Sequence, residues 1–90
     1  MAEADVTFMF DGQTYGFNPN KMSVLEGIEC QKFTGFTYIE WTEALQKFDA
    51  EAFRFLVWIT LKRHDKTPEG KYSAFDFDMA EVMASFEVPE

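Results

Sequence analysis

The sequence is poor in the residues that most enzymes and metal sites depend on. It contains one cysteine and one histidine, and its eight Lys and Arg face sixteen Asp and Glu, for a net charge of −8. A single cysteine, Cys30, cannot form a disulfide within the chain, which is compatible with a reducing cytoplasm. The acid excess argues against a general nucleic-acid binder, because such proteins neutralise phosphates with Lys and Arg. It argues equally against binding to anionic membranes.

Targeting and membrane-spanning segments are also missing from the pattern. Residues Met1–Asp5 (MAEAD) lack the basic region and apolar run of a signal peptide. No stretch approaches the roughly 20 apolar residues that a transmembrane helix needs. We therefore expect a protein of the cytoplasm that engages neither nucleic acid nor membrane.

No catalytic or cofactor motif is recognisable. The sequence has no GxGxxG, phosphate-binding Gly-Lys-Ser/Thr, HExxH or GxSxG motif. A Cys30–His64 nucleophilic pair would need a third group to orient the base, and the sequence indicates none. Asp76, Asp78 and Glu81 lack the spacing of a calcium loop and are more simply helix-capping and solubilising residues. We expect no enzyme, no cofactor and no metal.

What the chain has in quantity is aromatic side chains, with 11 Phe, 3 Tyr and 2 Trp among 90 residues. The length predicts a single domain spanning residues 1–90, large enough for one modest core. Two explanations of the aromatic content stay open. Either the small core uses large side chains, or part of the set is left for a binding surface, where aromatic residues are enriched.

A β-hairpin is predicted over residues 6–17. Asp11-Gly12 is a favoured two-residue turn because both positions need positive φ. With that turn, Phe8 faces Tyr15 and Val6 faces Phe17, and the alternating side chains share one apolar face. An isolated hairpin is marginal in water, so this face must pack on another element.

Two helices are predicted next, over residues 23–34 and 37–48. Each begins with a capping box, in which a Ser or Thr and a Glu three residues later satisfy reciprocal backbone N–H groups. Gly35 ends the first helix as a C-terminal cap. Leu25, Ile28 and Phe33 share a side of the first helix, with Lys32 at its edge, and Leu25 and Ile28 are expected to face the core. The second helix has an apolar set consisting of Ile39, Trp41, Ala44, Leu45 and Phe48.

The third helix, residues 49–64, is the element around which the chain is organised. Asp49 is expected to cap its first turn, and basic residues near its end suit the helix dipole. It carries two apolar faces. One follows the spacing of a core-facing helix, and the other consists of Phe55, Trp58 and Ile59. Either the rest of the chain wraps this helix or a partner covers the second face.

The remainder, residues 72–90, is an acidic C-terminal segment. It is predicted to hold a short apolar turn at 72–75 and a brief helix capped by Asp76 or Asp78, with Phe86–Glu90 frayed or held by a partner. The predicted fold class is α+β, an N-terminal β-hairpin packed on a small bundle of three to four helices. The predicted partner-binding residues are Phe55, Trp58, Ile59, Phe36 and Trp41, because a contiguous apolar patch usually marks a partner site.

The order of elements, from about Val6 to Val82, resembles the small tail assembly chaperones of long-tailed bacteriophages, especially those of actinobacterial phages. The resemblance rests on the Glu-rich first helix ending in Thr34-Gly35, on the helix motif FLVWITLKR at Phe55–Arg63, and on the acidic segment FDFD at Phe75–Asp78. These are core and capping patterns rather than a reactive signature. His64 and the charged residues after it, and the high Phe content, depart from the family pattern.

The resemblance implies a non-enzymatic protein of the host cytoplasm, absent from the mature virion. It would bind the tape measure protein, keep it soluble and help the major tail tube protein assemble around it, and it could form a homo-oligomer. Two alternatives stay open: a structural tail-completion or head–tail connector subunit, and a small acidic host-directed regulator.

Overall fold

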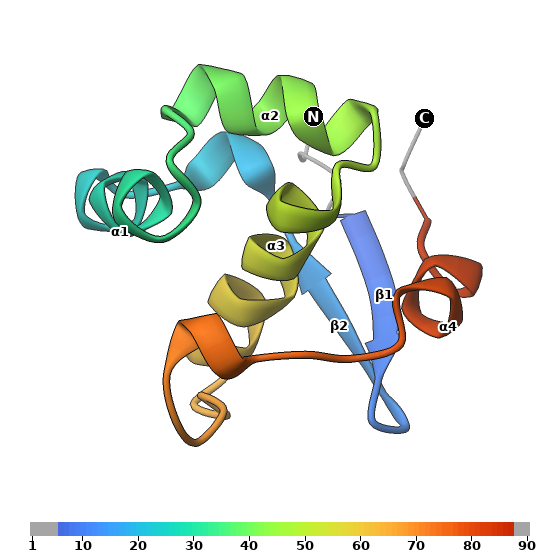
Figure 1. The fold of residues 1–90 in the computed structure, drawn as a ribbon. Coiled ribbons are helices and arrows are strands. Elements are labelled where there is room, and N and C mark those ends of the chain that lie inside the picture. The colour runs from blue at the N-terminus through green and yellow to red at the C-terminus, as the bar shows by residue number, and fades with distance from the viewer. Residues whose placement is uncertain (1–5, 88–90) are drawn as a thin grey trace.

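The computed structural model describes residues 6–87, and its arrangement confirms the α+β prediction. A two-stranded antiparallel sheet is followed by helices that pack together with it (Figure 1). None of the described helices is long and apolar enough to cross a membrane. The elements are β1 (Val6–Phe10), β2 (Gln13–Phe17), the 3-10 turn η1 (Pro19–Lys21), α1 (Val24–Thr34), α2 (Tyr38–Gln46), α3 (Ala50–Arg63), the 3-10 turn η2 (Tyr72–Ala74) and α4 (Met79–Ala84).

The hairpin has the predicted register. Val6 pairs with Phe17, and Phe8 pairs with Tyr15. Asp11 and Gly12 have φ values of 52° and 78°, as a two-residue turn with both positions left-handed requires. The four paired side chains are buried, so the hairpin places its apolar face on the rest of the chain.

The predicted caps of α1 and α2 are present. The Ser23 and Thr37 hydroxyls each accept from the backbone N–H three residues on, and their own backbone N–H groups donate to the carboxylates of Glu26 and Glu40. Gly35 closes α1 with a left-handed φ of 82°.

Helix α2 is shorter than predicted, since it ends at Gln46 rather than at residue 48. Phe48 adopts a φ of 55°, which breaks the helical path and turns the chain toward α3. Non-glycine residues rarely take this conformation, so the sequence offered no sign of the early end.

Helix α3 runs through the centre of the molecule (Figure 1). Asp49 caps it through bonds accepted from the N–H groups of Glu51 and Ala52. From Ala52 to Leu61 every residue except Arg54 is buried. Helices α1 and α2 and strand β2 all contact α3, so it is covered on several sides at once.

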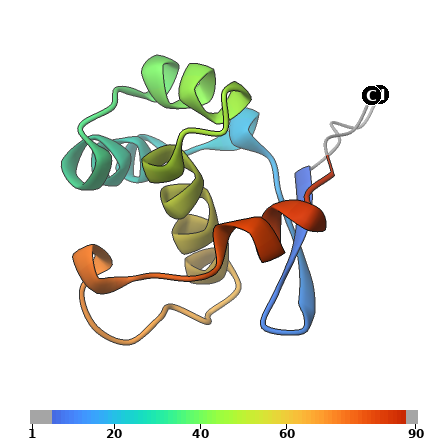
Figure 2. The same ribbon diagram turned by 45° about the vertical axis from the view of Figure 1, so that its right-hand side comes forward.

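The C-terminal segment supplies the remaining cover. It leaves η2, crosses beside α3 and places α4 against β1 (Figure 2). Asp78 is the residue that caps α4. Phe86 and Glu87, expected to be frayed or held by a partner, instead contact other elements of the chain. The Phe86 ring lies 5.5 Å from that of Phe53, and Glu87 exchanges backbone hydrogen bonds of 2.9 and 2.8 Å with Thr7. Residues 88–90 lie outside the described residues.

Candidate functional site

The second apolar face of α3 is not a surface. Phe55 and Ile59 have no exposed area, and Trp58 is only 7% exposed. The cover comes from the C-terminal segment, where the rings of Tyr72 and Phe75 lie 5.2 and 5.5 Å from that of Trp58. The expectation that these three α3 residues form an exposed partner face is therefore wrong for the folded chain.

Trp41, also predicted at the partner surface, is a core residue. It has no exposed area, and its ring makes edge contacts with Phe17 and Phe55 at 6.2 and 5.7 Å. Its indole N–H donates to the carbonyl oxygen of Ala52 at 3.0 Å, which satisfies the buried donor. Of the five predicted partner residues only Phe36 keeps partial exposure, beside a hollow between α2 and the start of α3.

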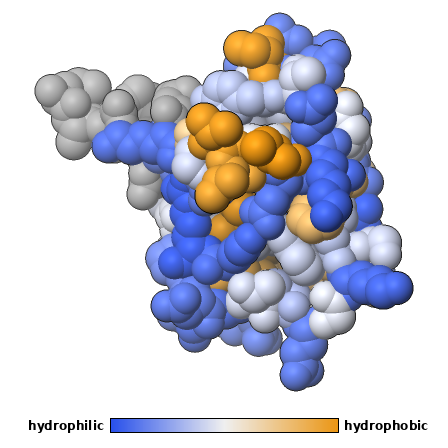
Figure 3. All heavy atoms as spheres, turned by 90° about the vertical axis from the view of Figure 1, so that its left-hand side faces the viewer, coloured by the Kyte–Doolittle hydropathy of each residue, from blue (hydrophilic) through white to orange (hydrophobic). Residues whose placement is uncertain are grey.

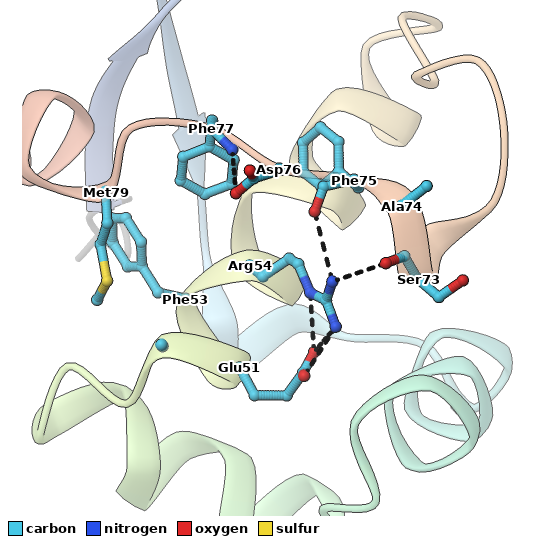
Figure 4. A pocket seen from close by; sticks show the side chains of 10 residues that line it. Glu51, Phe53, Arg54, Ser73, Ala74, Phe75, Asp76, Phe77 and Met79 are labelled. Carbon is cyan, nitrogen blue, oxygen red and sulfur yellow. Dashed lines mark hydrogen bonds and ion pairs between the residues drawn. The ribbon is translucent and has the colours of Figure 1, made fainter.

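Ionisable side chains gather at a cavity of about 480 Å³ between α3 and the C-terminal segment (Figure 4). Glu51 receives hydrogen bonds from the Arg54 guanidinium at 2.8 to 3.1 Å and from the Tyr72 hydroxyl at 2.5 Å. The guanidinium also lies 4.5 Å from the Tyr72 ring centroid. Glu51, Arg54 and Tyr72 thus form a cluster in which each polar group has a partner.

This cluster is suited to hold the C-terminal segment in place. Arg54 also donates to the backbone carbonyl oxygens of Ser73 and Phe75, both at 3.4 Å. Burial, together with the nearby Glu51 carboxylate, raises the pKa of the Tyr72 phenol far above its ordinary value. The phenol therefore stays a hydrogen-bond donor near neutral pH and does not act as a base.

The lone cysteine and histidine lie far from a catalytic arrangement. Cys30 is fully buried, and burial raises the pKa of its thiol, which opposes formation of the reactive thiolate. His64 is exposed at the end of α3, where its ring lies 5.2 Å from that of Tyr15. Within residues 6–87, no group of three Cys, His, Asp or Glu side chains is placed to hold a metal ion.

The largest departure from expectation is an apolar patch on α1. Leu25 and Ile28, expected to face the core, are 75% and 56% exposed, and Val24 is 80% exposed. We call these three residues the α1 patch. On the side of the molecule where α1 lies, apolar side chains gather at the surface (Figure 3). Ile39 of α2, at 63%, is exposed as well.

The orientation of α1 has a clear cause. Two ion pairs join it to the end of α3: Glu26 to Arg63 at 2.7 Å and Glu29 to Lys62 at 2.5 Å. Cys30 is buried, and on the same side the ring of Phe33 stacks 4.7 Å from Tyr72. These contacts turn the opposite side of the helix to solvent.

Sequence reasoning missed the α1 patch because it placed Phe33 on one side of α1 with Leu25 and Ile28, whereas Phe33 packs inward on the side of Cys30. The spacing of Glu26, Cys30 and Phe33 (i, i+4, i+7) was a second possible inner face. The ion pairs on the inner side connect residues 33 and 37 positions apart, and spacing within one helix does not reveal them.

The protein was also compared with protein-family models, with curated proteins and with solved structures. None of the three comparisons found a match. The resemblance to phage tail assembly chaperones therefore stays a prediction from sequence.

Proposed function

We propose that this protein is a non-enzymatic tail assembly chaperone that binds apolar helical segments of a phage tape measure protein. The observation that carries the proposal is the α1 patch, three large aliphatic side chains exposed together on a strongly acidic chain. Soluble proteins seldom leave such a group uncovered unless it contacts a partner. The resemblance of the sequence motifs to phage tail assembly chaperones is the reason for naming a tape measure protein as that partner.

The mechanism follows from the two properties of the surface. The α1 patch covers apolar side chains of the tape measure protein and so keeps them from associating with one another. The net charge of −8 repels other copies of the complex and keeps it in solution. Exchange of the chaperone for the major tail tube protein then leaves the tape measure inside the tube.

The ionisable groups of the described part do not favour an enzyme instead. Glu51, Arg54 and Tyr72 bond one another and the backbone, and the Cys30 thiol is buried. Their geometry is that of fixed structural contacts, with no nucleophile paired to a base.

Co-expression with the tape measure protein encoded in the same genome tests the proposal. The wild-type chain is expected to move the tape measure protein from the pellet to the soluble fraction. The double variant Leu25→Ser, Ile28→Ser is expected to lose most of this effect. A matched double variant, Thr67→Ser and Ser73→Thr, changes exposed loop and turn residues away from α1 and is expected to keep it.

Three outcomes would count against the proposal. A tape measure protein that stays equally insoluble with and without this chain would contradict it. The chain in stoichiometric amount in purified virions would identify a structural tail-completion or connector subunit. Tight capture of one host protein would instead identify a host-directed regulator.

A further inference from the structure

A groove runs beside the α1 patch, between α1 and the beginning of α2. It has a volume of about 350 Å³. Among the described residues its lining contains no charged side chain. The residues that shape it are Met22, Val24, Gly27, Ile28, Gln31 and Tyr38. A groove of this character takes apolar side chains in preference to charged groups, because burial of a charge without a partner is costly.

Gly27 is the unusual residue of this groove. It lies inside α1, where glycine is markedly less favourable than alanine. Its φ is not in the left-handed range, and a Cβ at this position would meet no described atom within 4 Å. Neither the backbone conformation nor packing within the chain therefore requires a glycine here. What its missing side chain does is keep the groove open.

The spacing of the lining residues indicates what shape of partner fits. Val24, Gly27, Ile28 and Gln31 stand at positions i, i+3, i+4 and i+7 of α1, the stripe by which one helix packs against another. The inner side of α1 is already occupied by contacts to α3. The outward stripe is thus a second helix-packing side without a helix on it among residues 6–87.

We propose that the groove is the seat for an amphipathic α-helix of another protein, with a large apolar side chain of that helix placed over Gly27. This inference deepens the proposed chaperone function and rests on it for the natural partner. The missing Cβ would let the partner helix approach more closely than alanine or leucine allows, as small residues do at helix contacts.

Charge distinguishes between a different protein and a second copy as the occupant. Each copy carries a net charge of −8, so two copies repel, whereas a helix with basic residues on its polar side is attracted. The acids of α1 do not oppose an apolar contact, because Glu26 and Glu29 are held by Arg63 and Lys62 on the α3 side. We therefore assign the groove to a basic amphipathic helix.

The test uses the full chain labelled with ¹⁵N and a synthetic helical peptide of Leu and Lys, about 20 residues long so that it can form a helix. Titration is expected to shift the amide signals of Gly27, Ile28 and Gln31 first and to saturate. Gly27→Leu fills the groove without changing charge. It is expected to raise the dissociation constant of the peptide by about tenfold or more, because the added side chain obstructs the contact.

The matched control is Gln46→Leu, which adds the same side chain at an exposed position of α2 outside the groove. It is expected to bind the peptide like the wild type, so that general acid–base attraction between peptide and protein is accounted for. Thermal melts of both variants check the fold, and Gly27→Leu is expected to melt at the same temperature as the wild type or higher, because leucine favours a helix.

Three results would overturn the inference. The first is equal peptide affinity in Gly27→Leu and wild type, and the second is amide shifts confined to surfaces away from α1. The third is a wild-type dimer that Gly27→Leu dissociates, which would make a second copy the occupant.

The same variants separate this inference from the proposed function. If Gly27→Leu keeps the tape measure protein as soluble as the wild type does, the chaperone function stands and the groove assignment fails. If the wild type fails to solubilise the tape measure protein but binds the peptide in a Gly27-dependent way, the groove stands and the chaperone function fails.

Discussion

Helices α3 and α1 differ in the burial of their apolar side chains, and in both the burial is the opposite of what the sequence suggested. On α3 the second apolar face, which the sequence alone leaves open to a partner, is sealed by the chain's own C-terminal segment. On α1 the aliphatic side chains expected inside are outside. The comparison teaches that an apolar face marks a surface only after the whole chain has been placed, because a distant segment can cover one helix and leave another bare.

Truncation of the α3 face should have the largest effect. Trp58→Ala removes a ring that contacts Phe33, Tyr72 and Phe75 in the interior. The free energy of unfolding is expected to fall by about 3–5 kcal/mol, as for other buried aromatic residues. Chemical denaturation measures it. A loss below about 1 kcal/mol would mean that Trp58 is not sealed in solution and would restore α3 as a candidate surface.

The cover over α3 can be weakened without opening a cavity. Tyr72→Phe keeps the ring stacked on Phe33 and removes the hydroxyl that donates to Glu51. The expected loss in unfolding free energy is about 1 kcal/mol, since Glu51 is partly exposed and water can replace the bond. Ser73→Thr, which leaves the hydroxyl contact intact, is the control. An unchanged midpoint for Tyr72→Phe would show that the cover is held by ring packing alone.

The ion pair that turns α1 outward should give a pH dependence. Hydrogen bonds from Arg63 hold the pKa of the Glu26 carboxyl below its ordinary value of 4.5, against the opposing effect of partial burial. A depressed carboxyl pKa stabilises the fold above the unfolded value and loses that contribution as the pH falls through the folded value. The contribution is expected to be at most about 1 kcal/mol, because Arg63 is largely at the surface.

Glu26→Gln isolates this contribution, since Gln also serves in a capping box. Melting curves recorded between pH 7 and pH 3 should show a smaller decline for the variant than for the wild type. Parallel declines would mean that the ion pair does not hold α1 in solution. The orientation of α1 would then rest on Cys30 and Phe33.

Substitution on the α1 patch should cost the least. Leu25→Ser and Ile28→Ser, each made singly, are expected to change the unfolding free energy by no more than about 0.5 kcal/mol, because both side chains are already exposed to water. Denaturant midpoints measure the change. A loss of 2 kcal/mol or more at either position would place that side chain in the core and remove the α1 patch.

Signals that act over a few residues predicted most of the secondary structure. The Asp11-Gly12 turn, the two capping boxes, Gly35 and Asp49 all do what their local chemistry indicates. Each depends on backbone donors within a few positions, so the sequence contains the whole cause.

The partner surface could not be predicted in the same way. Burial of Trp41 and Trp58 depends on Phe17 and Phe75, which lie in other elements. Ile28 is exposed because the opposite side of α1 buries Cys30 and forms ion pairs with α3. Helical spacing shows which residues share a side, but the choice of inner side is made by contacts between elements.

The bridge between Thr7 and Glu87 has a consequence for synthesis on the ribosome. Thr7 of β1 gains these two bonds from a residue that follows all four helices in the sequence, so they form only after the helices have been synthesised. A contact between residues so far apart in the sequence also has a larger entropic cost of loop closure than a local contact. Helices α1 to α3, with the ion pairs that join α1 to α3, lie between Thr7 and Glu87 in the sequence and can form earlier. The α1 patch and the groove can therefore exist before Thr7 and Glu87 pair.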